Sequence, residues 1–274
     1  MPPIDSNLDL RTIKSVKQIA PSAEQRTLGR LDVRIGEGIS VALTRLSTGQ
    51  SYEFRVMDFS SIGIGVESLP EDSRELSPED FHDGETLHVN FRLSNRNDSD
   101  HRYEFPCRVQ YVLLQVNGRI RMGLERIDVE ELRNRFSDGR MFTIPDTVLL
   151  RGLIDHPFLY DQTSIIEVRR ISRKSIIVVN RDRHFAVFPS VPVIFSLNIF
   201  SGREPINGHV SWVRPLNENG QGGGLEFAIE IDFMSDATDQ GLVRYLMRLT
   251  RSQPLDLRKA GFDTRKIKNI ISYR

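Results

Sequence analysis

The feature that most constrains the fold of this chain is a series of short segments in which apolar and polar residues alternate. This period of two is typical of strands with one buried face. In the first half of the chain such segments lie at 39–44, 52–56, 62–66, 87–93, 105–112 and 120–127. A short helix is predicted next, because Val129, Leu132 and Phe136 share one helical face. Closely spaced strands with no helices between them predict a small antiparallel barrel or sandwich.

The second half of the chain repeats this order. Its alternating or apolar segments lie at 165–168, 175–179, 193–199, 206–213 and 225–231, and a second helix is predicted over 236–250. When the two halves are aligned, Trp212 occupies the position of Tyr111. Two copies of one β-module explain this pattern better than one large fold. Residues 138–146, with Gly139 and Pro145, form the expected boundary.

Composition supports two domains and excludes several classes of protein. The chain has 274 residues, with 37 Lys and Arg against 37 Asp and Glu. A zero net charge argues against a general duplex-DNA binder, so no nucleic acid partner is expected. The single cysteine, Cys107, excludes an internal disulfide framework and a multi-cysteine zinc site. The sequence begins without a signal peptide and has no long apolar run, which predicts a cytoplasmic protein without a transmembrane segment.

The sequence also argues against an enzyme. None of the six histidines lies at metal-ligand spacing from another histidine or from Cys107, and no nucleophile-elbow, zinc-protease or phosphate-loop motif occurs. We therefore expect no catalytic residue, no metal and no cofactor. Cys107, within an apolar strand, is interpreted as a core residue.

One combination of motifs indicates a ligand. Asp58, Ser60 and Gly63 form a D-x-S-x-x-G pattern between two predicted strands. Arg30 and Arg34 form an R-x-x-x-R pattern just before the first strand, and Arg26 has the same spacing to Arg30. In these motifs, and in its strand order, the chain resembles the PilZ family over most of residues 30–136. The resemblance implies a six-stranded barrel that binds the bacterial second messenger cyclic di-GMP through Arg30, Arg34, Asp58, Ser60 and Gly63, with Arg26 as a possible third arginine.

The chemistry of these residue types suits such a ligand. Arginine donates pairs of hydrogen bonds to phosphate oxygens or to guanine O6 and N7, and its flat face stacks on a base. Asp58 offers acceptors to the donor edge of guanine, and Ser60 either donates or accepts. Gly63 is expected to adopt a positive φ in a tight turn between strands and to leave room for the base.

The second module lacks this pattern. Alignment places Arg170 at the position of Asp58, Ser172 at Ser60 and Ser175 at Gly63. The acceptor has become a cation and the glycine is lost, so we interpret the second module as a degenerate PilZ-like barrel. The predicted fold is mainly β, with two tandem six-stranded antiparallel PilZ-like barrels, each closed by a short C-terminal helix. The expected domains are an arm (1–29), the PilZ domain (30–137), the degenerate domain (147–250) and a basic tail (251–274).

The functional hypothesis is a cyclic di-GMP receptor without catalytic activity. Residues 1–34 lack apolar periodicity, so we expect this arm to be mobile and to become ordered over the first barrel when ligand binds. The second barrel would then transmit the event or dock a downstream protein partner. The alternatives are an interaction scaffold that binds no nucleotide, or the regulatory segment of a larger enzyme.

Overall fold

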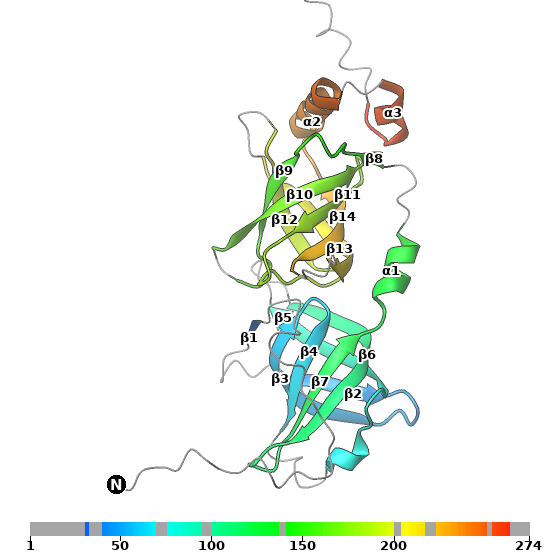
Figure 1. The fold of residues 1–274 in the computed structure, drawn as a ribbon, viewed down its shortest axis with the longest axis vertical. Coiled ribbons are helices and arrows are strands. Elements are labelled where there is room, and N and C mark those ends of the chain that lie inside the picture. The colour runs from blue at the N-terminus through cyan, green and yellow to red at the C-terminus, as the bar shows by residue number, and fades with distance from the viewer. Residues whose placement is uncertain are drawn as a thin grey trace, which may run out of the picture.

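The chain folds into two closed, six-stranded antiparallel β-barrels arranged one above the other (Figure 1). The computed structural model describes residues 31–32, 40–69, 76–94, 100–136, 141–159, 161–199, 204–216, 223–250 and 254–263. The expectation of a mainly β protein with two barrels is confirmed.

The first barrel closes in the order β2-β3-β4-β7-β6-β5, with β5 paired back to β2. Its strands are β2 (Ser40–Arg45), β3 (Ser51–Ser60), β4 (Gly63–Ser68), β5 (Thr86–Ser94), β6 (Asp100–Leu114) and β7 (Ile120–Arg126). A two-residue strand, β1 (Leu31–Asp32), adds to the edge of β3. A 3-10 turn at Pro78–Asp80 precedes Phe81, whose buried ring packs edge-on against Phe54 in the barrel core.

The second barrel closes in the equivalent order, β9-β10-β11-β14-β13-β12, with β12 paired to β9. Its strands are β9 (Arg151–Asp155), β10 (Thr163–Ile171), β11 (Ser175–Asn180), β12 (Pro192–Leu197), β13 (Ile206–Pro215) and β14 (Leu225–Phe233). The two-residue strand β8 (Phe142–Thr143) pairs with the end of β10, as β1 pairs with the end of β3. The two modules therefore share strand order and an additional short edge strand.

Strand β9 is the one barrel strand that the alternating pattern did not predict. Its inward-facing positions are Gly152 and Ile154, both buried. A Cβ at Gly152 would lie 2.3 Å from the carbonyl oxygen of Ser196 on β12, so glycine permits the close approach of these strands. Because glycine has no apolar side chain, the alternation of apolar and polar residues did not reveal this strand.

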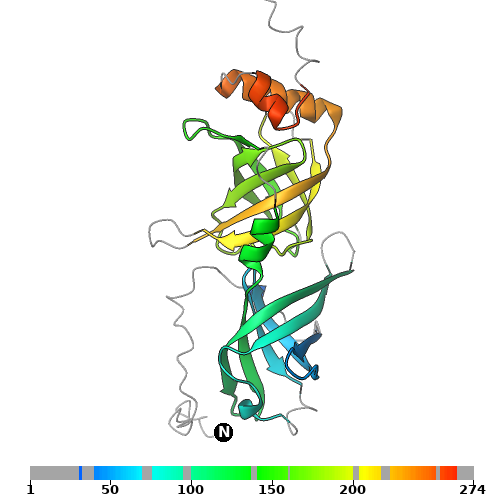
Figure 2. The same cartoon turned by 90° about the vertical axis from the view of Figure 1, so that its right-hand side faces the viewer.

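The helix after the first barrel, α1 (Val129–Arg135), packs against the second barrel rather than the first. Figure 2 shows it alongside that barrel. Asp128 occupies its N-cap position but makes no side-chain capping hydrogen bond. The carboxylate of Asp128 instead accepts hydrogen bonds from Arg126, at 2.7 and 2.8 Å from Nη2.

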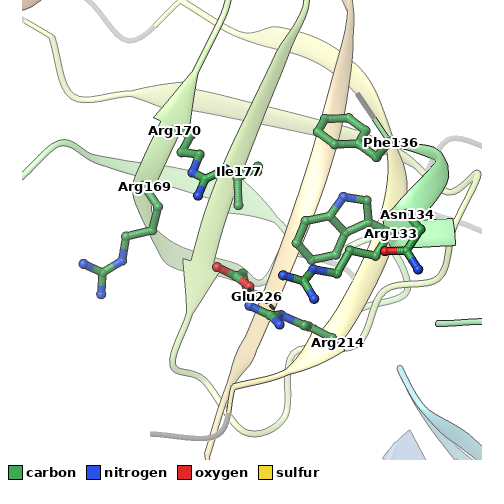
Figure 3. Close-up of a pocket in the computed structure, with 9 residues that line it drawn as sticks. Arg133, Asn134, Phe136, Arg169, Arg170, Ile177, Arg214 and Glu226 are labelled. Carbon is green, nitrogen blue, oxygen red and sulfur yellow. Dashed lines mark hydrogen bonds and ion pairs between the residues drawn. The ribbon is translucent and has the colours of Figure 1, made fainter. Parts of the chain in front are cut away.

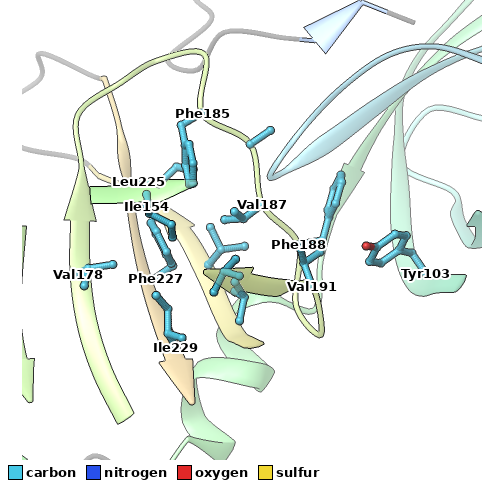
Figure 4. Close-up of a cluster of buried hydrophobic side chains, with 14 of the residues drawn as sticks. Tyr103, Ile154, Val178, Phe185, Val187, Phe188, Val191, Leu225, Phe227 and Ile229 are labelled. Carbon is cyan, nitrogen blue, oxygen red and sulfur yellow. The ribbon is translucent and has the colours of Figure 1, made fainter. Parts of the chain in front are cut away.

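The loop between β11 and β12 joins the two barrels (Figure 4). Phe188 on this loop is 1% exposed, and its ring stacks on Phe105 of the first barrel at a centroid distance of 6.0 Å. Phe59 and Tyr103 of the first barrel lie within 5.7 and 5.5 Å of the same ring, measured between centroids. The buried core is thus continuous from one barrel to the other.

Two helices lie at the far end of the second barrel: α2 (Asp236–Thr250) and α3 (Pro254–Lys259) (Figure 1). Leu257, Ala260 and Phe262 are buried, so the start of the expected tail packs into the domain. The backbone N–H of Arg173 donates to the carbonyl oxygen of Ala260 at 3.0 Å. Within the described residues, no helix is long and apolar enough to span a membrane.

Candidate functional site

The D-x-S-x-x-G segment lies at the end of β3 and the start of β4, where the sequence analysis placed it. A β-bulge between Val56 and Asp58 interrupts the pairing of these two strands. Such a bulge re-aims the side chains that follow it. Asp58 and Ser60 are 6% and 5% exposed, and Leu31–Asp32 of β1 pairs with Phe59–Asp58.

The carboxylate of Asp58 lies over Gly65 on the neighbouring strand β4. A Cβ at Gly65 would come within 2.7 Å of Asp58 Oδ1, closer than real Cβ atoms approach. Arg121 Nη2 donates to Asp58 Oδ2 at 3.1 Å from β7. Because Ile64 and Val66 are core residues, Gly65 between them faces the outside of the barrel.

A second glycine extends this surface. Gly65 pairs with Gly123 on β7, and Gly123 pairs with Tyr111 on β6. A Cβ at Gly123 would lie 2.2 Å from the Tyr111 ring, so the ring packs directly on the glycine. We call Asp58, Gly65, Gly123 and Tyr111 the glycine face. The Asp58 carboxylate and the Tyr111 ring lie directly on its two glycines. Sequence reasoning missed Gly65, Gly123 and Tyr111 as site residues, because their proximity depends on the pairing of strands distant in sequence.

The three candidate arginines, Arg26, Arg30 and Arg34, lie outside the described residues. Of the other predicted site residues, the structure brings Asp58, Ser60 and Gly63 together on one strand connection. Gly63 departs from the prediction in one respect. Positive φ angles occur at Gly49, Gly84, Gly118, Gly224 and Gly261, and not at Gly63, which begins β4 in an extended conformation. The prediction of a positive φ at Gly63 was wrong, because β3 and β4 are connected without a left-handed residue at this position.

Ser61, which the motif leaves unspecified, contacts the second barrel. It is 1% exposed, and its Oγ accepts a hydrogen bond of 2.9 Å from the backbone N–H of Val187. Val187 immediately precedes Phe188 on the inter-barrel loop (Figure 4). The motif turn of the first barrel is therefore bonded directly to the segment that joins the two barrels.

The second barrel has a counterpart of every position of the glycine face. A bulge between Val168 and Arg170 matches that between Val56 and Asp58, and places Arg170 at the position of Asp58. The pairs Arg170–Ile177 and Ile177–Ala228 correspond to Asp58–Gly65 and Gly65–Gly123. Trp212 pairs with Ala228 as Tyr111 pairs with Gly123, which confirms the predicted alignment of these two aromatic residues. Side chains thus replace both glycines in the second barrel.

In the second barrel, the turn between β10 and β11 is stabilised by hydrogen bonds within the turn. Ser172 Oγ accepts from the backbone N–H of Ser175 at 2.9 Å and from that of Lys174 at 3.2 Å. Both serine side chains are buried. Ser172 therefore stabilises the turn, and its acceptor lone pairs are used internally.

Cys107 and His156 are both buried. No group of three or more potential metal ligands occurs among the described residues. Cys107 is fully buried, and burial raises the pKa of its thiol above the usual range. His156 is 2% exposed, and burial lowers its pKa to about 4. Its Nδ1 accepts from the backbone N–H groups of Phe158 and Leu159, each at 3.1 Å, so the imidazole is neutral and organises a loop.

Comparison with known proteins finds similarity at the level of solved structures. No family model and no curated protein matches the sequence. The solved structures it resembles include a PilZ domain. This is the PilZ domain of YcgR from Escherichia coli with c-di-GMP, at 13% identity over 38% of this chain and 79% of that one, with a TM-score of 0.30. The Bacillus subtilis inhibitor of motility, MotI/DgrA, matches at 13% identity over 81% and 99%, with a TM-score of 0.29. YcgR from E. coli in complex with c-di-GMP matches at 10% identity over 78% and 84%, with a TM-score of 0.31.

Proposed function

We propose that this protein is a receptor for cyclic di-GMP and binds it on the glycine face of the first barrel. The observation that supports this most directly is the position of the Asp58 carboxylate on Gly65, next to Gly123, on which the Tyr111 ring lies. Only glycine leaves room for this carboxylate and this ring to lie directly on the surface of the sheet. The carboxylate beside that surface accepts hydrogen bonds from the N–H groups of guanine.

The arginines of the R-x-x-x-R segment would supply the cationic part of the site. Arg30 is the residue before β1 and Arg34 the second residue after it, and β1 pairs with Phe59–Asp58. A short covalent distance along the chain therefore links both arginines to the strand that bears Asp58. Each arginine can donate forked hydrogen bonds to a phosphate or to a guanine. In this proposal the arm closes over the ligand and the barrel supplies the opposite wall.

The same geometry suggests how binding would be transmitted. Ser60 and Gly63 flank Ser61, whose hydroxyl holds the inter-barrel loop through Val187. A ligand on the motif turn would alter the position of Ser61 and hence the loop. We propose that the second barrel reports this change to a downstream protein partner, and that neither barrel carries out catalysis.

Calorimetric titration of the full chain with cyclic di-GMP tests the proposal. Arg30→Ala and Arg34→Ala should each lower the affinity by at least about 2 kcal/mol, because each removes charge-assisted hydrogen bonds. Arg135→Ala is the matched control, since Arg135 is exposed on α1, which packs against the second barrel. Asp58→Ala should weaken binding and reduce the preference over cyclic di-AMP. No binding by the wild-type chain would contradict the proposal and favour a nucleotide-free scaffold.

Hydrogen exchange tests the role of the arm. We expect residues 20–36 to exchange more slowly when cyclic di-GMP is bound, because the arginines would then hydrogen-bond to the ligand. Equal protection with and without ligand would show that the arm does not close.

A further inference from the structure

The second barrel carries a basic pocket at the position that corresponds to the glycine face (Figure 3). Its volume is about 310 Å³, within the range of small-ligand sites. The charged residues in its lining are Arg133 from α1, Arg169 and Arg170 from β10, Arg214 from β13, and Glu226 from β14. Four cations and one anion leave an excess of positive charge around a small space.

This pocket has the inverse charge pattern of the first barrel. There, Asp58 of β3 accepts from Arg121 of β7. In the second barrel the register places Arg170 at the position of Asp58 and Glu226 at that of Arg121. Where the first barrel offers a carboxylate acceptor, the second offers guanidinium donors. A ligand that suits the second barrel must therefore supply acceptors and negative charge.

Helix α1 is held over the pocket by apolar contacts. Leu132, Phe136 and Met141 pack against a separate buried cluster of Ile177, Trp212 and Ala228. The rings of Phe136 and Trp212 meet edge-on, with centroids 6.2 Å apart. This packing fixes the end of α1 and presents Arg133 to the pocket, as Figure 3 shows.

The carboxylates beside these arginines form partly exposed pairs. Arg133 Nη1 lies 3.3 Å from Glu130, Arg169 Nη2 lies 3.8 Å from Glu167, and Arg214 Nε donates to Glu226 at 2.5 Å. Arg133 and Glu130 are 42% and 66% exposed, so a bound oxyanion can replace this pairing at small cost, whereas Glu167 and Glu226 are only 20% and 17% exposed. Trp212 Nε1, in the same lining, is buried and has no hydrogen-bond acceptor among the described residues. The pocket thus has more donors than acceptors.

Size and shape restrict the anion further. Ile177 and Ala228, at the positions of Gly65 and Gly123, are buried under Leu132, Phe136 and Met141, so no flat surface is open to a purine ring there. Paired arginines match the geometry of phosphate oxygens. We propose that this pocket binds a compact anion with two linked phosphate groups, and that it is a ligand site distinct from that of cyclic di-GMP.

The single tryptophan of the chain gives a direct readout of this pocket, because Trp212 lines it. The probe is inorganic pyrophosphate, titrated into the full chain while tryptophan fluorescence is followed. Orthophosphate and sulfate at equal ionic strength test whether one tetrahedral oxyanion is enough. We expect a saturable fluorescence change with pyrophosphate and weaker binding of the two single oxyanions.

Three variants locate the binding. Arg170→Ala and Arg133→Ala should weaken pyrophosphate binding by about tenfold or more, since each removes charge-assisted hydrogen bonds. Arg135→Ala, an exposed arginine on the same helix that does not line the pocket, should leave binding unchanged within about twofold. Circular dichroism checks that each variant is folded.

Two outcomes would overturn the proposal. The first is that pyrophosphate does not bind, or that Arg135→Ala weakens its binding as much as Arg133→Ala does. Equal weakening by the two variants would indicate general charge attraction. The second is a failure of pyrophosphate combined with Arg170-dependent binding of a polyglutamate peptide, which would indicate a docking groove for an acidic protein segment.

Discussion

The backbone N–H of Val187 donates a hydrogen bond of 2.9 Å to Oγ of Ser61, across the junction of the two barrels. Ser61 lies in the turn that also bears Ser60 and precedes Gly63, and Val187 precedes the buried ring of Phe188. The turn that contains the D-x-S-x-x-G motif is therefore linked to the buried Phe188 between the barrels through this one hydrogen bond and the adjacent residue Val187.

Ser61→Ala should loosen the inter-barrel loop. The variant leaves the buried Val187 N–H without an acceptor, which costs about 1–3 kcal/mol of unfolding free energy. We expect faster hydrogen exchange at residues 185–191 and a smaller effect of cyclic di-GMP on that exchange than in the wild type. Ser211→Ala is the control, because the Ser211 hydroxyl bonds to Glu230 at an exposed site. If exchange of the loop is the same in both variants, the hydrogen bond is not a connection between the barrels.

Phe188→Ala should destabilise the whole chain by about 3 kcal/mol, because a buried ring is removed and a cavity is left. The ring contacts aromatic residues of both barrels, including Phe59 and Phe158, at centroid distances of 5.7 and 5.8 Å. Denaturant unfolding should therefore separate into two transitions as the barrels lose their joint core. Phe233→Ala is a matched control, since Phe233 is 61% exposed. A single transition with unchanged midpoint would show that the interface adds no stability.

Gly65→Ala should weaken cyclic di-GMP binding with little loss of stability. The new Cβ would lie 2.7 Å from Asp58 Oδ1, so the carboxylate must move away from its position. The effect of Gly65→Ala should be small when Asp58 is already alanine, because the two changes act on one group. Gly241→Ala serves as control, since the nearest atom to its Cβ would be 4.0 Å away. Additive losses in the double variant would contradict this role for Gly65.

Arg170→Ala and Ser172→Ala should leave the affinity for cyclic di-GMP unchanged. The second barrel has filled both glycine positions of the candidate site and uses the Ser172 hydroxyl within its own turn. Calorimetry on the full chain measures this directly. A loss greater than about threefold in either variant, which is roughly 0.6 kcal/mol, would show that the second barrel takes part in binding the dinucleotide.

Acidification should destabilise the protein through His156. The pKa of this residue is lowered to about 4 in the folded chain, against about 6.5 when it is unfolded. The unfolded state then binds the proton first, so stability is full above pH 6.5 and falls as the pH drops from 6.5 toward 4. The loss approaches about 3 kcal/mol. Denaturant unfolding at pH 7 and pH 5 measures it.

His156→Asn provides the control, because an amide oxygen can accept the backbone hydrogen bonds but does not titrate in this range. The difference in unfolding free energy between pH 7 and pH 5 should be smaller in this variant. An equal pH dependence in wild type and variant would assign it to other groups.

Local pattern was enough to predict most strands, the helix at 236–250 and the internal repeat. It also aligned Arg170 with Asp58 and Trp212 with Tyr111, as the sheet register bears out. These features are accessible because alternation and spacing are properties of neighbouring residues in one segment. The motif Asp58-x-Ser60 could be recognised because its residues are also neighbours in one segment. Strand β9 was missed because a glycine occupies one of its core positions.

Tertiary structure decided which surfaces meet. Nothing in the local pattern around Gly65 or Gly123 indicates that they lie side by side, since that depends on the pairing of β4 with β7. Similarly, α1 follows the first barrel in sequence but packs on Trp212 of the second. Phe188 joins the barrels through contacts between residues some eighty positions apart or more. The sequence by itself determined the two modules and the motif, because both are encoded locally. The glycine face, its charge-inverted counterpart and the shared core arise only when strand register and barrel packing bring distant residues together.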